Sequence, residues 1–454
     1  MSTARSAPVE STNAAATGLS EPIPLPDSAK EDIHTAELPQ EVDVIPNGGY
    51  GWVVAVCILC SNAVTWGNNT TYGVFTAYYL QNNYFNASDL DYAWVGGLSV
   101  AAALILAPLA NWLTQRTNYR VSLFIGASLV VLGQCLAGIS TSFGPFLVCQ
   151  GLVFGAGLGL VLIPSLPLLA HWFDTRLALA QGLAAAGSGL GGLVLANTTR
   201  AALENPRLGV KWALIINGGI SAAVLFPAIA LLRGRHKAVG ARSAPYEAKW
   251  FVHPGFVWVL LWAFFAMIAY FIAIYSLASF ATSALGLSQG QGAALQSILS
   301  AGQMIGRPAW GFLLDKGGRI NMTIVCYIAC GLSTLCIWLP ARSFAVLAVF
   351  AFIQGVTGGT IWSASTPIAA RVVGVKDLQS AMAIFWLVLV LPALVGQPIA
   401  IALLQHSTGT LGRQGAEAYY ISIGFCGGVA LFSAALLYGA KRHLQGNWRL
   451  WQIT

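Results

Sequence analysis

Charged residues are scarce in this chain of 454 residues, at 9% of the total, whereas 56% of the residues are hydrophobic. Soluble globular proteins carry about 25% charged residues, so this chain has too few to cover a water-facing surface. The shortage excludes an ordinary soluble enzyme and a disordered chain. It indicates a helical protein that crosses a membrane several times.

Acidic residues are absent from the interiors of the apolar stretches. Half of the sixteen acids fall in residues 1–48, which contain two bases and have a net charge of −6. This segment has no aromatic residue and no apolar run of the kind that a secretory signal needs, so we expect a disordered cytosolic tail. The other eight acids lie in loops or at the ends of apolar stretches. No paired acid, His cluster or Ser-His-Asp arrangement within the apolar stretches suggests an enzyme.

The eight cysteines all lie in apolar runs. Cys57 and Cys60 have a spacing that occurs in metal and redox sites, but no second pair and no nearby His accompany them. We interpret them as small buried residues, and we expect no disulfide, no metal and no cofactor.

Twelve apolar stretches of about 20 residues, the length that a spanning helix needs, follow the tail. They cover residues 53–78, 93–113, 121–140, 145–167, 178–198, 211–232, 255–280, 291–313, 321–340, 344–366, 380–403 and 419–439. The longest polar stretch between them divides them into two sets of six. We therefore expect an all-α membrane protein whose parts are an N-terminal six-helix bundle (49–232), a cytosolic linker (233–254), a C-terminal six-helix bundle (255–440) and a short cytosolic tail (441–454).

Lys and Arg are distributed unevenly between the two sides of this topology. With the amino terminus in the cytosol, fifteen bases after the tail fall on the cytosolic side and five on the other side. Positive residues favour the cytosolic side, so both termini are expected there. Asn86-Ala87-Ser88 then lies in the first outer loop, and Asn86 is the best-placed glycosylation acceptor.

The two sets of six share a repeat at an offset of 200 residues. Residues 311–319 follow the eighth span and match the pattern G-x-x-x-D-[RK]-x-G-[RK]. Residues 111–120 occupy the same place after the second span, with Asn111, Gln115 and Asn118 in place of Gly, Asp and Gly. Parallel six-helix repeats are typical of one large transporter class, whose substrate site lies between the halves near mid-membrane.

The complete copy of this motif predicts a cytosolic gate. Gly311 allows two helices to approach closely, Asp315 caps or pairs across the gate, and Lys316 and Arg319 anchor the loop in water. A simple basic turn would explain the bases but not the full spacing. The motif resembles the loop signature of the major facilitator superfamily, which implies two parallel six-helix repeats that move by alternating access.

Two further stretches resemble the signatures of monocarboxylate transporters, in particular their fungal branch. Residues 46–52 read PNGGYGW at the start of the first span, and residues 171–191 lead into the fifth span with HWFDTRLALAQG followed by AGSGLG. The resemblance covers roughly residues 46–440 and implies a carrier of small organic acids. This chain departs from that family's pattern at Asn47, which replaces an acid, and at Gln303, which replaces the Asp of an Asp-x-x-x-Arg pair. It also has no Lys late in the first span.

Arg307, the Arg of that pair, lies inside an apolar run eight residues before Asp315. At about 1.5 Å per residue it lies about 12 Å from the gate, near mid-membrane. A charge at that depth costs roughly 2.5–3.5 kcal/mol on insertion scales and is a functional candidate by default. We interpret Arg307 as the group that binds a substrate carboxylate, with Gln303, Asn69 and Thr70 as further polar contacts. A purely structural Arg, and hydrogen bonds between helices at the other three positions, remain the alternatives.

Together these features predict a permease for a monocarboxylate or a related small organic or amphiphilic metabolite. We expect it to lie in the lipid bilayer of the plasma membrane rather than the vacuole, and to work as a monomer without nucleic acid. Because the span interiors lack titratable groups, transport is expected to depend weakly on a proton gradient or not at all. One alternative is an efflux carrier for a secondary metabolite or drug-like compound, and a less favoured one is a nutrient sensor that does not transport.

Overall fold

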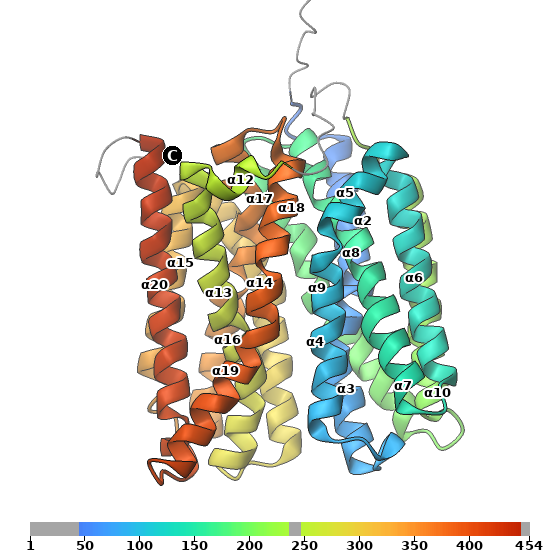
Figure 1. Ribbon diagram of the computed structural model, residues 1–454, viewed down its shortest axis with the longest axis vertical. Helices are drawn as coiled ribbons and strands as arrows, with labels where there is room; N and C mark the ends of the chain where they lie inside the picture. The colour runs from blue at the N-terminus through green and yellow to red at the C-terminus, as the bar shows by residue number, and fades with distance from the viewer. Residues whose placement is uncertain (1–44, 236–246, 446–454) are drawn as a thin grey trace, which may run out of the picture. The chain divides into compact units, whose positions relative to one another are not determined.

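The computed structural model describes residues 45–235 and 247–445. Nearly all of the expected disordered tail, half of the expected linker and the last nine residues therefore lie outside the described residues. We call residues 45–235 the first half and residues 247–445 the second half. Both halves are helical, and no β-strand occurs in the described ranges. In Figure 1 the first-half helices lie on the right and the second-half helices on the left.

The first half contains six membrane-spanning segments. Their elements are α2 (Tyr50–Val64) with α3 (Trp66–Gln81), α4 (Asp89–Ile105) with α5 (Ala107–Arg116), α6 (Tyr119–Ile139), α7 (Phe143–Phe146) with η2 (Leu147–Val153), α8 (Phe154–Ser165) and η3 (Leu166–His171), α9 (Leu177–Glu204), and α10 (Gly209–Leu231). A short 3-10 turn, η1 (Tyr84–Asn86), joins α3 to α4. The helices α4 and α5 meet at a bend of 43°. Pro108 stands in the first turn of α5, where its missing N–H needs no helical partner.

The second half repeats this arrangement after the short helix α12 (Lys249–Val252). Its elements are α13 (Pro254–Ser279) with η4 (Phe280–Ala284), α14 (Gln289–Gly317), α15 (Arg319–Ser333) with η5 (Thr334–Trp338), α16 (Phe344–Gly358) with α17 (Thr360–Val373), α18 (Leu378–Val388) with α19 (Val390–Gly409), and η6 (Gly415–Tyr419) with α20 (Tyr420–Gln445). The last helix continues five residues beyond the expected boundary at residue 440.

All twelve expected stretches fall on helices or on directly joined helices. Within the described residues, ten of these are long and apolar enough to cross a membrane, and the bent pair of α4 and α5 adds an eleventh. The twelfth is α14, which has 29 residues but is less apolar because it contains Gln303, Arg307 and Asp315. The helix that falls short in hydropathy is therefore the one that carries two of the predicted binding residues, Gln303 and Arg307, and three of the predicted gating residues, Gly311, Asp315 and Lys316.

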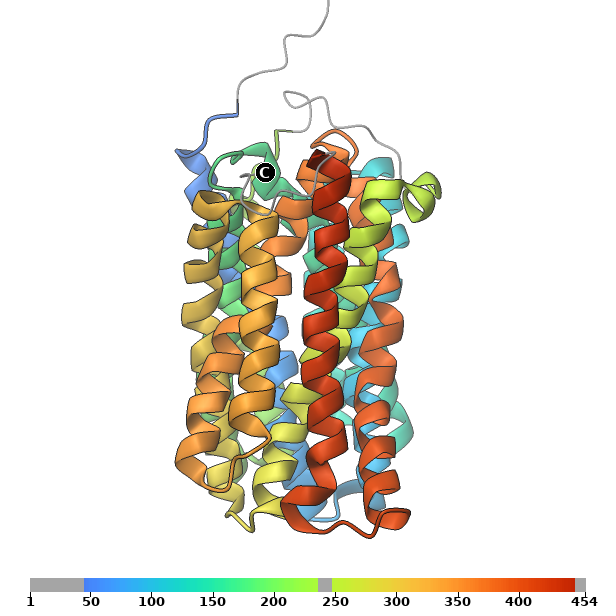
Figure 2. The same cartoon turned by 90° about the vertical axis from the view of Figure 1, so that its left-hand side faces the viewer.

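The ends of the helices define two faces of the bundle. Helix α2 begins and α20 ends at the upper end in Figures 1 and 2, which we call the terminal face; the opposite end is the distal face. At the distal face α4 and α14 begin with capping boxes, in which Ser88 pairs with Asp91 and Ser288 with Gln291. At the terminal face Gly318, with φ of +88°, separates α14 from α15, and this conformation favours glycine.

Helices α9 and α14 come from different halves and pack closely together. A Cβ on Gly182 would lie 2.2 Å from the carbonyl oxygen of Arg307, and a Cβ on Gly311 would lie 2.3 Å from that of Ala178. Real Cβ atoms do not approach backbone oxygens so closely, so only glycine allows this helix spacing. The close approach brings the backbone of α9 within hydrogen-bond reach of side chains on α14.

The two monocarboxylate-like stretches lie against each other at the terminal face. The Asn47 side-chain oxygen accepts hydrogen bonds from the backbone N–H groups of Asp174 and Thr175, both at 2.8 Å, and from the Thr175 hydroxyl at 3.0 Å. The rings of Tyr50 and Trp172 lie 5.7 Å apart. The Asn47 side chain is uncharged, and its amide oxygen supplies the acceptor that holds this loop.

Candidate functional site

Arg307 lies where the two halves meet, and its side chain is 4% exposed. One guanidinium nitrogen, Nη1, donates to the Ala185 carbonyl oxygen at 2.6 Å and contacts the Ser188 hydroxyl, both on α9. The other, Nη2, donates to Gln303 Oε1 at 2.8 Å and to the Tyr270 hydroxyl oxygen at 3.4 Å. The guanidinium therefore bridges the first half to α13 and α14 of the second half.

Every partner of this cation is neutral. Among the described residues no carboxylate forms an ion pair with Arg307, and its Nε has no hydrogen-bond partner. A buried charge without an opposite charge is costly, because the surrounding dipoles replace only part of the lost hydration. The centre of the molecule therefore carries a positive charge that an anion would neutralise.

The structure brings together only part of the predicted binding set. Gln303 contacts Arg307 directly, as its position one helical turn earlier implies. Asn69 instead donates to the Ser99 hydroxyl at 2.8 Å, and Thr70 donates to the Gly67 carbonyl at 2.8 Å. Both lie on α3, and we find no hydrogen bond from either residue to Arg307.

Ser188, the Ala185 carbonyl and Tyr270 are the Arg307 partners that the sequence did not predict. The run Ala186-Gly187-Ser188-Gly189 belongs to the stretch 171–191 that resembles a family signature, and that pattern does not indicate a contact with Arg307. A hydroxyl in the middle of this small-residue run was the available signal.

Three tryptophans lie together beside the centre. Trp66 on α3 and Trp362 on α17 have ring centroids 5.3 Å apart, and Trp362 stacks on Trp386 of α18 at 5.7 Å with an interplanar angle of 19°. We call these three residues the tryptophan wall. The structure shows that Trp386 is 1% exposed and packs against Trp362 and Phe385.

Beyond the tryptophan wall, toward the distal face, α3 faces open space. Trp66, Thr70 and Gly73 share one face of this helix, because residues four and seven positions apart lie nearly in line. Trp66 contacts the second half, whereas Thr70 and Gly73 are exposed and a Cβ on Gly73 would meet no atom within 4 Å. On this face the contact between the halves therefore ends at Trp66.

Besides the bonds of Arg307 near the centre, further hydrogen bonds join the halves at the terminal face. Asp315 at the end of α14 accepts from the backbone N–H groups of Ala178 at 3.1 Å and Leu179 at 2.8 Å, in the first turn of α9. These N–H groups have no partner within their own helix, and the helix dipole favours an anion at this end. Asp315 therefore caps a helix of the opposite half.

The other predicted gating residues play unequal parts in this contact. Arg319 bonds to the Asp174 carbonyl in the first half and to the Pro367 carbonyl at 3.3 Å in its own half. Gly311 provides the close approach to Ala178. Lys316 is exposed and lies over the Phe312 ring at 4.3 Å, on its own helix.

The degraded copy of the motif forms a neutral version of this contact. Asn111 Nδ2 donates to the Gln379 carbonyl at 2.8 Å, and Gln379 Nε2 donates to Asn111 Oδ1 at 3.3 Å. The two copies thus join the halves at the same face, one through a carboxylate and one through paired amides.

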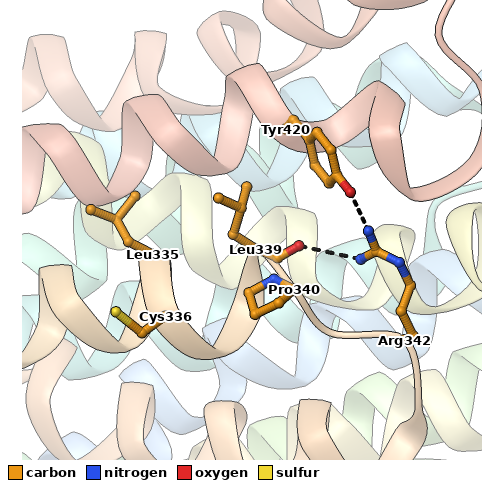
Figure 3. Close-up of a pocket in the computed structure, with 6 residues that line it drawn as sticks. All are labelled: Leu335, Cys336, Leu339, Pro340, Arg342 and Tyr420. Carbon is orange, nitrogen blue, oxygen red and sulfur yellow. Dashed lines mark hydrogen bonds between the residues drawn. The ribbon is translucent and has the colours of Figure 1, made fainter.

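A separate open cavity of about 430 Å³ lies at the distal end of the second half (Figure 3). It is lined by Leu335, Cys336, Leu339, Pro340, Arg342 and Tyr420. Arg342 donates to the Leu339 carbonyl at 3.3 Å and contacts the Tyr420 hydroxyl. These residues all come from one half, so this cavity does not belong to the site at Arg307.

Two smaller predictions concern the loops and the cysteines. Asn86 is exposed on the turn between α3 and α4 at the distal face, and its glycosylation remains a prediction. All eight cysteines are free. Among the described residues, no group of three His, Cys, Asp or Glu side chains is placed to hold a metal ion.

Known proteins place this architecture in a family. The sequence matches the Major Facilitator Superfamily model over residues 57–341 and 259–448. It is 33% identical to the probable transporter MCH2 of Saccharomyces cerevisiae, over 86% of this chain and 82% of that protein. It is 28% identical to the aspyridones efflux protein apdF of Emericella nidulans, over 91% of this chain and 83% of that protein. The fold is similar to that of the proton:xylose symporter XylE, with a TM-score of 0.67 and 12% identity over 85% of this chain and 94% of that one. The chain therefore belongs to the Major Facilitator Superfamily and is a multi-pass membrane transporter.

Proposed function

We propose that this transporter carries a monocarboxylate or a related small organic anion, and that Arg307 binds the carboxylate. The observation that supports the proposal is the neutral set of partners around a buried guanidinium at the contact between the halves. A carboxylate would supply the missing negative charge, and a guanidinium can hold it through two parallel hydrogen bonds. The sequence resemblance to monocarboxylate transporters supports the same substrate class.

Alternating access follows from which contacts join the halves. The described conformation is joined at the terminal face by Asp315, Arg319 and Asn111, and Arg307 bridges the halves near the centre. A substrate that enters from the distal side would bind Arg307 and compete with Ser188 and the Ala185 carbonyl for the guanidinium. Losing these bonds would weaken the link between α9 and α14, which favours opening of the terminal face.

The membrane and orientation are part of the proposal. The excess of Lys and Arg at the terminal face supports cytosolic termini, and we place the protein in the plasma membrane as a monomer, because one chain supplies all the groups of the site. A tag at the carboxyl terminus that reacts with antibody on intact cells, without permeabilisation, would refute this orientation.

Export of a larger metabolite is the second candidate. The similarity to apdF supports it, because that protein is an aspyridones efflux protein. The tryptophan wall also offers more aromatic surface than a small aliphatic acid would cover. Export and uptake use the same fold, so comparing metabolites inside and outside cells that lack or overproduce the protein separates the two directions.

The decisive experiment replaces Arg307. We expect Arg307→Ala to abolish carboxylate uptake into proteoliposomes and Arg307→Lys to restore it only in part, because an ammonium cannot reproduce the paired geometry. Radiolabelled pyruvate and acetate serve as probes. Arg200→Ala is the matched control, since Arg200 lies on α9, is exposed and pairs with Glu204 one turn later on the same helix.

Membrane insertion and thermal stability of each variant must be measured alongside uptake. Normal uptake by a stable Arg307→Ala protein would refute the anion-binding role. Equal losses in the Ala and Lys variants, with unchanged folding, would support the role and show that the guanidinium geometry is indispensable.

A further inference from the structure

The indole N–H groups of the tryptophan wall form no hydrogen bonds within the described residues. None of the Nε1–H groups of Trp66, Trp362 and Trp386 finds an acceptor among the described residues. The same is true of Trp262 and Trp338, which pack within the second half. The wall differs from these in that its rings contact one another across the two halves.

The helix that carries Trp362 packs against Arg307. Gly359 lies directly before α17, and a Cβ placed on it would lie 3.0 Å from Arg307 Nε. Trp362 follows one turn later on the same helix, and its carbonyl accepts from Gln181 of α9 at 3.4 Å. The next residue, Ser363, donates to the Arg307 carbonyl at 3.3 Å. The turns of α14 and α17 that carry Arg307 and Trp362 therefore pack against each other and against α9, and we treat Arg307 and the wall as one candidate site.

The unpartnered polar groups of this site are mostly donors. They are the three indole N–H groups and Arg307 Nε, whereas Gln181 contributes one unpartnered acceptor oxygen. Leaving such a buried group unpaired costs roughly 1–3 kcal/mol. A ligand rich in acceptor oxygens would satisfy several of them, and a ligand with many donors would not.

The shape of the wall adds a second requirement. Trp66 and Trp362 are partly exposed, belong to opposite halves, and lie where the contact between the halves ends on α3. Two such rings can separate and close again as the halves move, and a flat ring between or against them would gain offset-stacked or edge-to-face contacts.

We propose that the tryptophan wall selects anions with a flat, conjugated or aromatic body, whose carboxylate binds Arg307 and whose ring packs on Trp362 and Trp66. The inference rests on the proposed role of Arg307 in anion binding. It adds a substrate class, since a small aliphatic acid would reach Arg307 and leave the wall uncovered.

The test compares two acids with the same number of carbon atoms. Benzoate is flat and cyclohexanecarboxylate is puckered, but both carry one carboxylate on a six-membered ring. Titration calorimetry on the full-length protein in nanodiscs should show that benzoate binds roughly 3- to 10-fold more tightly than cyclohexanecarboxylate. This ratio of dissociation constants corresponds to the free energy of one or two aromatic contacts. Trp362→Leu should remove this preference by weakening benzoate alone, and Trp362→Phe should retain most of it.

Trp94→Leu is the control, because Trp94 is 57% exposed on α4 and should leave both affinities unchanged. Equal binding of the two acids, or an equal loss of both in a stable Trp362→Leu protein, would overturn the aromatic selectivity and leave the Arg307 role standing. If Arg307→Ala binds both acids as the parent does, the proposed function fails instead. If the parent protein binds neither acid, both proposals are refuted.

Discussion

Replacing Asp315 by Asn tests whether the carboxylate cap holds the terminal face closed. The substitution keeps the size of the side chain and removes its charge. In the structure the Asp315 side chain is 8% exposed, and the nearest cation is Arg319, with Nε 3.8 Å from Oδ1. The carboxylate accepts from Ala178 and Leu179 through its two oxygens, at 3.1 and 2.8 Å. An Asn side chain has only one acceptor oxygen, so one of these N–H groups loses its partner.

The expected magnitude follows from these two bonds. A hydrogen bond to a charged group contributes about 1.5–3 kcal/mol, and a neutral one about 0.5–1.5 kcal/mol. Losing one charged bond and weakening the other should cost about 2 kcal/mol, which corresponds to about a 30-fold change in the balance between closed and open forms. A closed-to-open ratio of about 30 would then fall to about 1.

Distance measurement between spin labels detects this change. Cysteines at positions 116 and 376 place one label on each half at the terminal face, where Arg116 and Lys376 are both exposed. Cys336 is the single cysteine classed as exposed, so Cys336→Ser removes the most reactive background site. We expect Asp315→Asn to add a population at longer distance, and Lys316→Gln to leave the distribution unchanged. Identical distributions for Asp315→Asn and the parent protein would refute the role of the carboxylate.

Three further predictions concern packing, loop anchoring and coupling. Gly182→Ala should impair transport because its Cβ would lie 2.2 Å from the Arg307 carbonyl oxygen. Gly428→Ala is the control, because a Cβ at Gly428 meets no atom within 4 Å and transport should stay normal. Equal activity of the two variants would contradict the close packing of α9 on α14. Asn47 has φ of +52°, so Asn47→Gly keeps the backbone conformation but loses the three hydrogen bonds to residues 174 and 175. The unfolding temperature of this variant should fall, whereas that of Asn47→Asp should stay near the parent value. An unchanged unfolding temperature for Asn47→Gly would refute the role of Asn47 as an anchor of this loop. Transport into proteoliposomes should change little when an inward proton gradient is imposed, and steep stimulation would contradict the weak coupling that we infer from the lack of acids in the span interiors.

The two copies of the gate motif illustrate how one repeat can diverge. In the second half Asp315 contacts the start of α9, and in the first half Asn111 contacts Gln379 at the start of α18. Both contacts join a motif helix to a helix of the opposite half. Only the first involves a charge, so salt and charge substitutions should act mainly on the contact between α9 and α14.

The sequence by itself determined the fold class, and it predicted the number of spanning segments and the depth of Arg307. These follow from local properties, because each spanning helix needs about 20 apolar residues and satisfies its backbone hydrogen bonds within itself. For the same reason the sequence indicated that α14 combines a deep cation with a gating carboxylate.

Only the tertiary structure decided which groups meet. Asn69 and Thr70 had suitable polarity and depth, yet the rotation of α3 directs Asn69 to Ser99 and leaves Thr70 exposed toward the distal side. Ser188 looked like one small residue among several, and the close packing at Gly182 places its helix against Arg307. Contacts between helices depend on their relative rotation and spacing, and one sequence without its packing partners fixes neither.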